Sequence, residues 1–226
     1  MSARTSPDTI SRVALDLEAG GGWEVAGADG VGRGCLAGPI VAAAVVLDYS
    51  LLTVDELAPQ LAGLGDSKKL TAKARERLYP LIIRQASRFA IVSAGNRTID
   101  EQGLHITNLR ILGRSLESLV SCPQVALVDG RLRLPGCHVS HTPITKGDSK
   151  SACIAAASII AKVTRDRLMR RLHQRYPEYG FDGHVGYGSK AHREAIARHG
   201  YSPIHRRSFT VTLPELLEAS IAGGND

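Results

Sequence analysis

The chain has 226 residues and a formal net charge of +6, with 43% hydrophobic and 22% charged residues. These values suit one globular core with a small terminal appendage and exclude a disordered or fibrous protein. Residues 1–18 are polar and do not resemble a secretory signal, and the apolar run 36–47 is too short to span a bilayer. We therefore expect a soluble, cytoplasmic protein that does not associate with membranes.

The positive charge is concentrated in the C-terminal part of the chain. Residues 146–226 hold 13 basic and 8 acidic side chains, so they carry five of the six excess charges. A polyanionic partner is plausible, although charge alone favours a solvated basic face. The four cysteines lie far apart and form no C-x-x-C pair, which indicates neither a zinc site nor disulfides. We expect them to be small buried hydrophobes: Cys35, Cys122, Cys137 and Cys153.

The first half of the chain predicts a hairpin, a helix and a third strand. A strand at 23–28 enters a glycine-rich turn at 29–34, and a second strand follows at 39–47. Residues 51–64 are loosely helical. A helix is expected at 71–88, with Thr71 as its N-cap, followed by a strand at 89–94.

The second half is mainly helical. An amphipathic helix is expected at 104–120 and a short strand at 125–128. The longest helical pattern covers 151–175, and further helices are expected at 190–198 and 214–221. One face of the first helix carries Leu104, Asn108, Ile111, Leu112, Ser115, Leu116 and Leu119.

These elements predict an α/β fold with a mixed sheet flanked by helices. We expect a polar N-terminal extension at 1–20, a main α/β domain at 21–175 and a small helical C-terminal portion at 176–226 that packs on it. Five arginines crowd the long helix, where a solvated outer face is the simplest explanation: Arg165, Arg167, Arg170, Arg171 and Arg175. The histidines at 184, 192, 199 and 205 have no metal-ligand spacing and are expected to be surface or hydrogen-bonded groups.

Four aspartates stand where a carboxylate is expected to be functional. Asp29 and Asp129 each end a predicted strand, Asp148 precedes the long helix and Asp166 lies inside it. Strand ends and helix starts meet at one edge of a sheet, and clustered carboxylates need a cation to offset their repulsion. The pattern therefore indicates a site for Mg²⁺ or Mn²⁺. Taken singly, Asp129 is better explained as a turn residue and Asp148 as a helix cap, but together with Asp29 these explanations lose weight.

The glycine-rich turn at 29–34 has two interpretations. A dinucleotide-binding loop must lead from a strand into a helix, whereas a strand-like run follows here, so a nucleotide-cofactor enzyme is disfavoured. The glycines instead allow the backbone to lie directly against a ligand. A simple hairpin turn explains one or two of the glycines but not Arg33 among them.

Taken together, these stretches resemble the bacterial ribonuclease HII family over about residues 23–210. The matching stretches are ADGVGRG at 28–34, AGP at 37–39, DSKKL at 66–70, VDG at 128–130, KGDS at 146–149, IAAASIIAKVTRD at 154–166, GYG at 186–188 and HRRSF at 205–209. Each fragment is modest, but their order and spacing are specific. The resemblance implies an RNase H-like fold.

The resemblance also implies a set of site residues. Asp29, Asp129 and Asp148 would be catalytic metal ligands, and Asp166 would support the long helix and its neighbours. The remaining residues would bind substrate. Gly32, Arg33 and Gly34 would sense the ribose 2′-hydroxyl through backbone groups, Tyr187 would pack on the sugar at the RNA-to-DNA junction, and Lys68 and Lys69 would lie near phosphates.

Two positions depart from the family pattern. Gly30 stands where the family has a glutamate, and Val185 stands where a lysine is common before the Gly-Tyr-Gly element. The first departure removes a carboxylate from the site itself and affects catalysis more than binding. The second removes one positive charge beside the substrate channel.

The resemblance implies a monomeric endonuclease that uses two ions, Mg²⁺ or Mn²⁺, to hydrolyse the RNA strand of RNA/DNA hybrids and ribonucleotides embedded in duplex DNA. The products would carry 5′-phosphate and 3′-hydroxyl ends. The alternative is a weakly active or inactive variant of the same fold that binds hybrids, because Gly30 replaces a catalytic glutamate.

Overall fold

The computed structural model describes residues 7–20, 24–47, 49, 63–64, 67–121 and 123–212. Its elements in chain order are α1 (Pro7–Gly20), β1 (Val25–Val31), β2 (Ile40–Leu47), α3 (Ala72–Gln85), β3 (Ala86–Ala94), α4 (Asn96–Gln102), α5 (Leu104–Glu117), β4 (Val125–Asp129), β5 (His141–Ile144), η1 (Gly147–Ser149), α6 (Ala152–Arg175), η2 (Pro177–Tyr179), α7 (Phe181–His184) and α8 (Lys190–His199).

Five strands of the described chain form one mixed sheet in the order β3-β2-β1-β4-β5. The predicted hairpin is confirmed, because β1 and β2 pair antiparallel and β3 joins β2 in the same sense. β4 runs parallel to both β1 and β5. The carboxyl ends of β1 and β4 therefore meet at one edge of the sheet, where ligands commonly bind in α/β folds.

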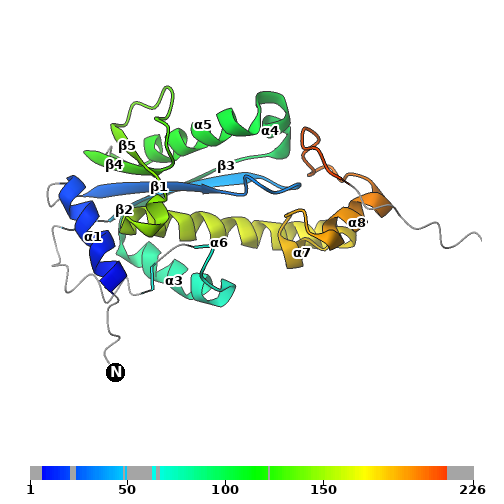
Figure 1. The fold of residues 1–226 in the computed structure, drawn as a ribbon, viewed down its shortest axis with the longest axis horizontal. Helices are drawn as coiled ribbons and strands as arrows, with labels where there is room; N and C mark the ends of the chain where they lie inside the picture. Colours follow the sequence, from blue (N-terminus) through cyan, green and yellow to red (C-terminus); the bar gives the residue numbers. More distant parts are fainter. Residues whose placement is uncertain are drawn as a thin grey trace, which may run out of the picture.

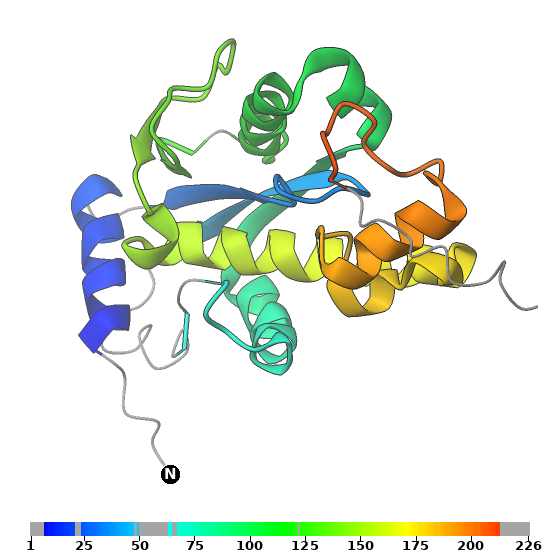
Figure 2. The ribbon, with the colours of Figure 1, turned by 45° about the vertical axis from the view of Figure 1, so that its right-hand side comes forward.

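Helices cover both faces of the sheet (Figures 1 and 2). Alternate residues of β1 and β2 point to opposite faces, as the pleat requires. Val25 and Val41 join the core beneath α6, whereas Ala26 and Ala42 join the core beneath α5. Gly27 is required under α6, since a Cβ there would lie 2.1 Å from the backbone of Cys153. The mixed sheet flanked by helices is thus the architecture that the sequence predicted.

The C-terminal helices pack at the far end of α6, as Figure 2 shows. Met169 of α6, Tyr179 and Phe181 form a third apolar cluster there, together with Ala195 of α8. The segment after α8 then turns back toward α4, where the side-chain amide of Asn96 donates to two carbonyls of that segment. This return path brings residues near 205 against the loop between β1 and β2.

The N-terminal helix α1 packs against the rest of the fold. Val13 and Asp16 are fully buried, and the Asp16 carboxylate accepts hydrogen bonds from the Tyr49 hydroxyl (2.6 Å) and the Cys153 amide (2.9 Å). Arg12, on the same helix, donates hydrogen bonds to the carbonyls of Ser149 (3.0 Å) and Leu64 (2.8 Å). The helix therefore supports the loop that precedes α6.

Several element boundaries differ from the prediction. The helix expected to reach residue 88 ends at Gln85, because Ala86 and Arg88 pair with Leu47 and Val46 of β2. The helix expected over 104–120 ends at Glu117. α4 and β5 were not predicted. β5 contains a proline and no apolar alternation, and its pairing with β4 defines it.

Some predictions fall on residues outside the described part: residues 51–62 of the loosely helical segment 51–64, the helix at 214–221, and the positions Trp23, Asp66 and Cys122. Cys35 and Cys153 are buried free thiols as expected, but Cys137 is only half-buried. Among the described residues, no helix is long and apolar enough to cross a membrane.

Candidate active site

Two parallel strands bring the first two carboxylates together. β1 and β4 pair in register from Val25 and Val125 to Ala28 and Val128, so Asp29 and Asp129 come next on neighbouring strands. β4 ends at Asp129 as predicted. Asp29 does not end its strand, however, because β1 continues to Val31 through pairing with β2. The Asp29 side chain therefore projects from a rigid strand and not from a turn.

Burial and neighbouring charge act together on Asp29, which is 8% exposed. Burial and then the negative charge of Asp129 raise the pKa of Asp29 to about 7, and Asp148 adds to the effect. Hydrogen bonds from Ser158 and from the Gly30 amide (2.6 Å) oppose it. A carboxyl whose pKa is raised by other carboxyls marks a place where a cation is favoured.

The third carboxylate is held beside the second by a backbone contact. The Gly147 amide donates to Asp129 Oδ1 at 2.8 Å, which ties the start of η1 to the end of β4. Gly147 packs closely against Ile154, since an added Cβ would lie 2.5 Å from the terminal methyl group of that side chain and would force it to move. Asp148 is 9% exposed in the next position. It is therefore placed by a tight, buried turn and not simply by capping α6, whose N-cap is Ser151.

A cavity of about 790 Å³ is lined by the second and third carboxylates and by basic side chains. Asp129 and Asp148 line it together with Arg33, Lys68 and Lys69. One wall comes from α5, through Asn108 and Leu112. Positive side chains around a negative centre suit a ligand that is itself polyanionic but binds through a cation.

The glycine-rich loop after β1 is built around a buried arginine. Gly32 has φ +90°, and a Cβ there would lie 2.3 Å from Arg165 Nε. Arg165 is fully buried and donates to the carbonyls of Pro39 (2.8 Å), Val185 (2.8 Å) and Ala37 (3.1 Å). The expectation that this arginine lies on a solvated face was wrong, because loop carbonyls distant in sequence replace water around its guanidinium group.

A second buried arginine completes the same loop. Arg206 donates to the carbonyls of Gly38 (3.0 Å) and Arg33 (3.1 Å) from the segment after α8. β2 follows this loop directly, so the strand-to-helix arrangement of a dinucleotide-binding loop is absent from this described segment. At Gly34 a Cβ would meet no atom within 4 Å. The backbone of this loop is therefore held by hydrogen bonds from the two buried arginines, and it is unobstructed by other atoms at Gly34.

Tyr187 is tied to the same loop. It forms an antiparallel bridge with Cys35, and the Leu36 amide donates to the Gly186 carbonyl at 2.8 Å. The ring is 41% exposed, and Lys162 Nζ lies 5.3 Å from its centroid. Val185, directly before this element, has φ +44°, an unfavourable conformation for a β-branched residue. Its carbonyl is held in that conformation by Arg165.

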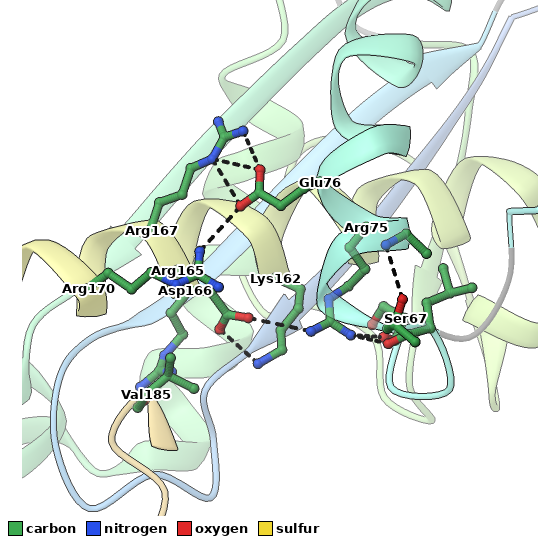
Figure 3. A network of polar contacts seen from close by, with 12 residues as sticks. Ser67, Arg75, Glu76, Lys162, Arg165, Asp166, Arg167, Arg170 and Val185 are labelled. Carbon is green, nitrogen blue, oxygen red and sulfur yellow. Dashed lines mark hydrogen bonds and ion pairs between the residues drawn. The ribbon is translucent and has the colours of Figure 1, made fainter. Parts of the chain in front are cut away.

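Asp166 belongs to a network that extends through Arg75 to Ser67, next to Lys68 (Figure 3). It accepts a hydrogen bond from Lys162 Nζ at 2.8 Å and pairs with Arg75 at 3.7 Å. Arg75 in turn donates to the carbonyls of Ser67 and Leu70, on either side of Lys68 and Lys69. The network thus ties α6 to α3 and to the lysine loop.

The structure brings most of the predicted site together and adds residues that the sequence did not single out. Asp129, Asp148, Arg33, Lys68 and Lys69 share one cavity, while Tyr187 and the glycines share a neighbouring loop. Within the described residues, no group of three His, Cys, Asp or Glu side chains is arranged to hold a metal ion by itself. The buried arginines and Asn108 were missed. A polar residue on the apolar face of α5 was the one signal available for Asn108.

The fold and its acidic, basic-rimmed cavity define a nuclease of the RNase H-like class, and comparisons with known proteins agree. The family model for ribonuclease HII matches residues 26–212, and a ribonuclease HII from Rhizobium johnstonii is 43% identical over 92% of each chain. The chain belongs to the ribonuclease HII family, whose members are endonucleases and hydrolases. Metal binding is typical of that family.

Solved structures support the fold assignment. The ribonuclease H2 of Pyrococcus horikoshii superimposes with a TM-score of 0.69 at 31% identity, covering 82% of this chain and 93% of that one. Bst-RNase HIII, solved in complex with Mn²⁺, gives a TM-score of 0.68 at 22% identity, over 90% of this chain and 71% of that one. The second likeness concerns the fold alone.

Proposed function

We propose that this protein hydrolyses the RNA strand of RNA/DNA hybrids and ribonucleotides embedded in duplex DNA, leaving 5′-phosphate and 3′-hydroxyl ends. The observation that carries the proposal is the cavity in which Asp129 and Asp148 lie together with Arg33, Lys68 and Lys69. The basic side chains suit the phosphates of a nucleic acid, and the carboxylates suit a divalent cation. The monomeric state remains a prediction of the family resemblance, and the cytoplasmic location remains a prediction from the sequence alone.

Asp29, Asp129 and Asp148 would hold Mg²⁺ or Mn²⁺, with two ions present during catalysis. The donor set fits, because it consists of carboxylate oxygens and because buried Asp29 is disfavoured as an anion without a cation. Mg²⁺ is usually held by one or two carboxylates together with water and substrate phosphates, so a closed protein cage is not required. Such ions activate a water molecule and stabilise the leaving oxygen.

The chain's own residues would prepare the site and select the sugar. The amides of Gly30 and Gly147 orient the carboxylates of Asp29 and Asp129. Gly32, Arg33 and Gly34 would read the 2′-hydroxyl with backbone groups, and Tyr187 would pack on the sugar. The open space at Gly34 supports this role, since a ribose can approach the backbone there without meeting a side chain.

The test is cleavage of a labelled DNA duplex that contains one ribonucleotide, with an all-DNA duplex as substrate control. We expect cleavage of the first duplex only, and only when Mg²⁺ or Mn²⁺ is added. Polymerase extension of the upstream fragment would report its 3′-hydroxyl end. Asp129→Asn and Asp148→Asn should reduce the rate by 100-fold or more, taking about 10–100-fold as the usual loss for a supporting group. Full activity of either variant would contradict the proposal.

The second candidate is a protein that binds hybrids but scarcely cuts them, and Gly30 is the residue that favours it. We predict low activity in Mg²⁺, partly rescued by Mn²⁺, which binds such sites more strongly. Gly30→Glu should raise the rate on the single-ribonucleotide duplex, provided that the new side chain displaces Asn108, whose Oδ1 lies 3.2 Å from the position of a Cβ. Equal rates for the two proteins would show that a carboxylate at position 30 is dispensable.

A further inference from the structure

Asn108 is a buried polar residue without an obvious structural purpose. It lies on the face of α5 that packs against the sheet, next to the apolar side chains of Ile111 and Leu112, and it is 7% exposed. Its Oδ1 atom is buried and has no hydrogen-bond partner among the described residues. A buried acceptor without a donor is destabilising, so such groups are rare in folded proteins unless a ligand or water satisfies them.

The position of Asn108 suggests what that ligand is. Asn108 lines the same cavity as Asp129 and Asp148. Directly opposite, Gly30 presents no side chain, and a Cβ there would lie 3.2 Å from Asn108 Oδ1. Because β1 alternates, Asp29 faces α6 and Gly30 faces α5. The asparagine amide therefore projects into the space that a longer side chain at residue 30 would occupy.

We propose that Asn108 supplies an additional oxygen ligand to the divalent cation held by the carboxylates, either directly or through one bound water. The inference rests on the metal site of the proposed function and adds a residue to it. An amide carbonyl is a hard, neutral oxygen donor of the kind that Mg²⁺, Mn²⁺ and Ca²⁺ accept. Compared with the glutamate that the family has at position 30, the Asn108 amide would supply an oxygen ligand but no negative charge. The site thus keeps its coordination at the edge of β1 but binds cations less tightly than a fourth carboxylate would allow.

The test is Mn²⁺ binding to the full-length protein without nucleic acid, followed by the electron paramagnetic resonance signal of free Mn²⁺. Asn108→Leu keeps the shape of the side chain and removes its oxygen. It should weaken Mn²⁺ binding about 10-fold, the lower end of the losses seen for supporting groups. Asn108→Asp adds a charge and should strengthen binding about 10-fold. Asp129→Asn is the reference variant and should weaken binding more than Asn108→Leu.

A second readout separates a ligand from a structural residue. Asn108→Leu removes a buried unsatisfied oxygen from an apolar helix face, so the metal-free variant should melt at the same or a higher temperature than the parent. Weaker Mn²⁺ binding with unchanged or improved folding would support the proposal. Parental Mn²⁺ affinity in Asn108→Leu, with the affinity of Asp129→Asn reduced, would overturn it and leave the proposed function intact. Parental affinity in both variants would overturn the metal site itself.

Discussion

At the scale of single residues, the site depends on two buried guanidinium groups that both hold loop carbonyls by hydrogen bonds. Arg165 and Arg206 together donate five hydrogen bonds to carbonyls of the loops that carry Arg33 and Val185. A planar guanidinium group can serve several carbonyls at fixed angles, which a lysine ammonium cannot do. The precise backbone course near Gly32 and Tyr187 therefore depends on residues far away in the sequence.

Arg165→Lys should lower the stability of the fold although the positive charge is retained. The lysine retains at most part of the three hydrogen bonds and leaves loop carbonyls unsatisfied, so we expect a loss of roughly 2–4 kcal/mol in the free energy of unfolding. Denaturant unfolding of the parent and of Arg165→Lys measures this loss. The control lies on the same helix: Arg167 is 44% exposed in its pair with Glu76, and Arg167→Lys should cost less than about 1 kcal/mol. Similar losses of unfolding free energy in the two variants would show that the hydrogen bonds of Arg165 do not hold the loops in place.

These residues also mark the limit of what the sequence could predict. The carboxylates, the lysines and the glycine loop were identifiable because their residue types carry chemistry and their spacing resembles a family. Asn108 was placed correctly on the apolar face of its helix and Arg165 wrongly on a solvated one, because nothing local indicates that α5 meets Gly30 or that α6 meets Pro39. Burial of a polar group is decided by contacts between distant segments, here 126 residues apart for Arg165 and Pro39.

At the scale of elements, long periodic segments were predictable and short ones were not. β2 and α6 follow the predicted ranges to within a residue, because β2 is a β-permissive apolar run that begins just after Gly38 and Pro39 and α6 repeats its apolar residues at three- or four-residue steps over 24 residues. α4 has seven residues, and β5 has four with a proline. Such elements exist because neighbours hold them: β5 pairs with β4, and the Gly130 amide donates to the Ile144 carbonyl at 3.1 Å.

The tie between α6 and α3 makes a testable prediction about substrate affinity. Asp166→Asn removes the charge that holds Arg75, which in turn holds the loop of Lys68 and Lys69. We expect hybrid binding to weaken about fivefold, equivalent to about 1 kcal/mol. Fluorescence anisotropy with a labelled hybrid and no divalent metal would measure it.

A matched control for Asp166→Asn is available on α8. Glu194 forms an exposed pair with Lys190 at 3.8 Å, with no connection to the lysine loop. Glu194→Gln removes one negative charge from the protein just as Asp166→Asn does, and it should leave hybrid affinity unchanged or slightly raised. If the two variants bind the hybrid equally well, Asp166 does not position the loop.

At the scale of the whole molecule, the C-terminal segment is connected to the site through a pair of buried histidines. His192 Nδ1 donates to the Tyr187 carbonyl (2.8 Å), so its Nε2 accepts from His205 Nε2 (3.0 Å). His205 Nδ1 then accepts from the Ser202 amide at 2.8 Å. Every ring nitrogen already has a partner of the right kind when both rings are neutral. An added proton would place two donors against each other.

This network predicts how stability depends on pH. Burial, with smaller contributions from neighbouring positive groups, lowers the pKa of His192 and of His205 to about 4, from an ordinary value of 6.5. Between these values the unfolded chain binds more protons than the folded one. The contribution of these histidines is therefore complete above pH 6.5 and is lost as the pH falls toward 4, on the order of 3 kcal/mol for one histidine taken singly.

Asp29 acts in the opposite direction over part of this range, because its pKa is raised from 3.8 to about 7. Acid therefore favours the folded protein through Asp29 while it disfavours it through the histidines. Comparing the parent with His205→Gln in metal-free buffer cancels the Asp29 effect. Denaturant unfolding from pH 7 to pH 4.5 should show that the stability difference between the two proteins shrinks as the pH falls, because the parent loses the contribution of His205, which the variant lacks. A difference that stays constant over this range would show that the buried histidines do not resist protonation.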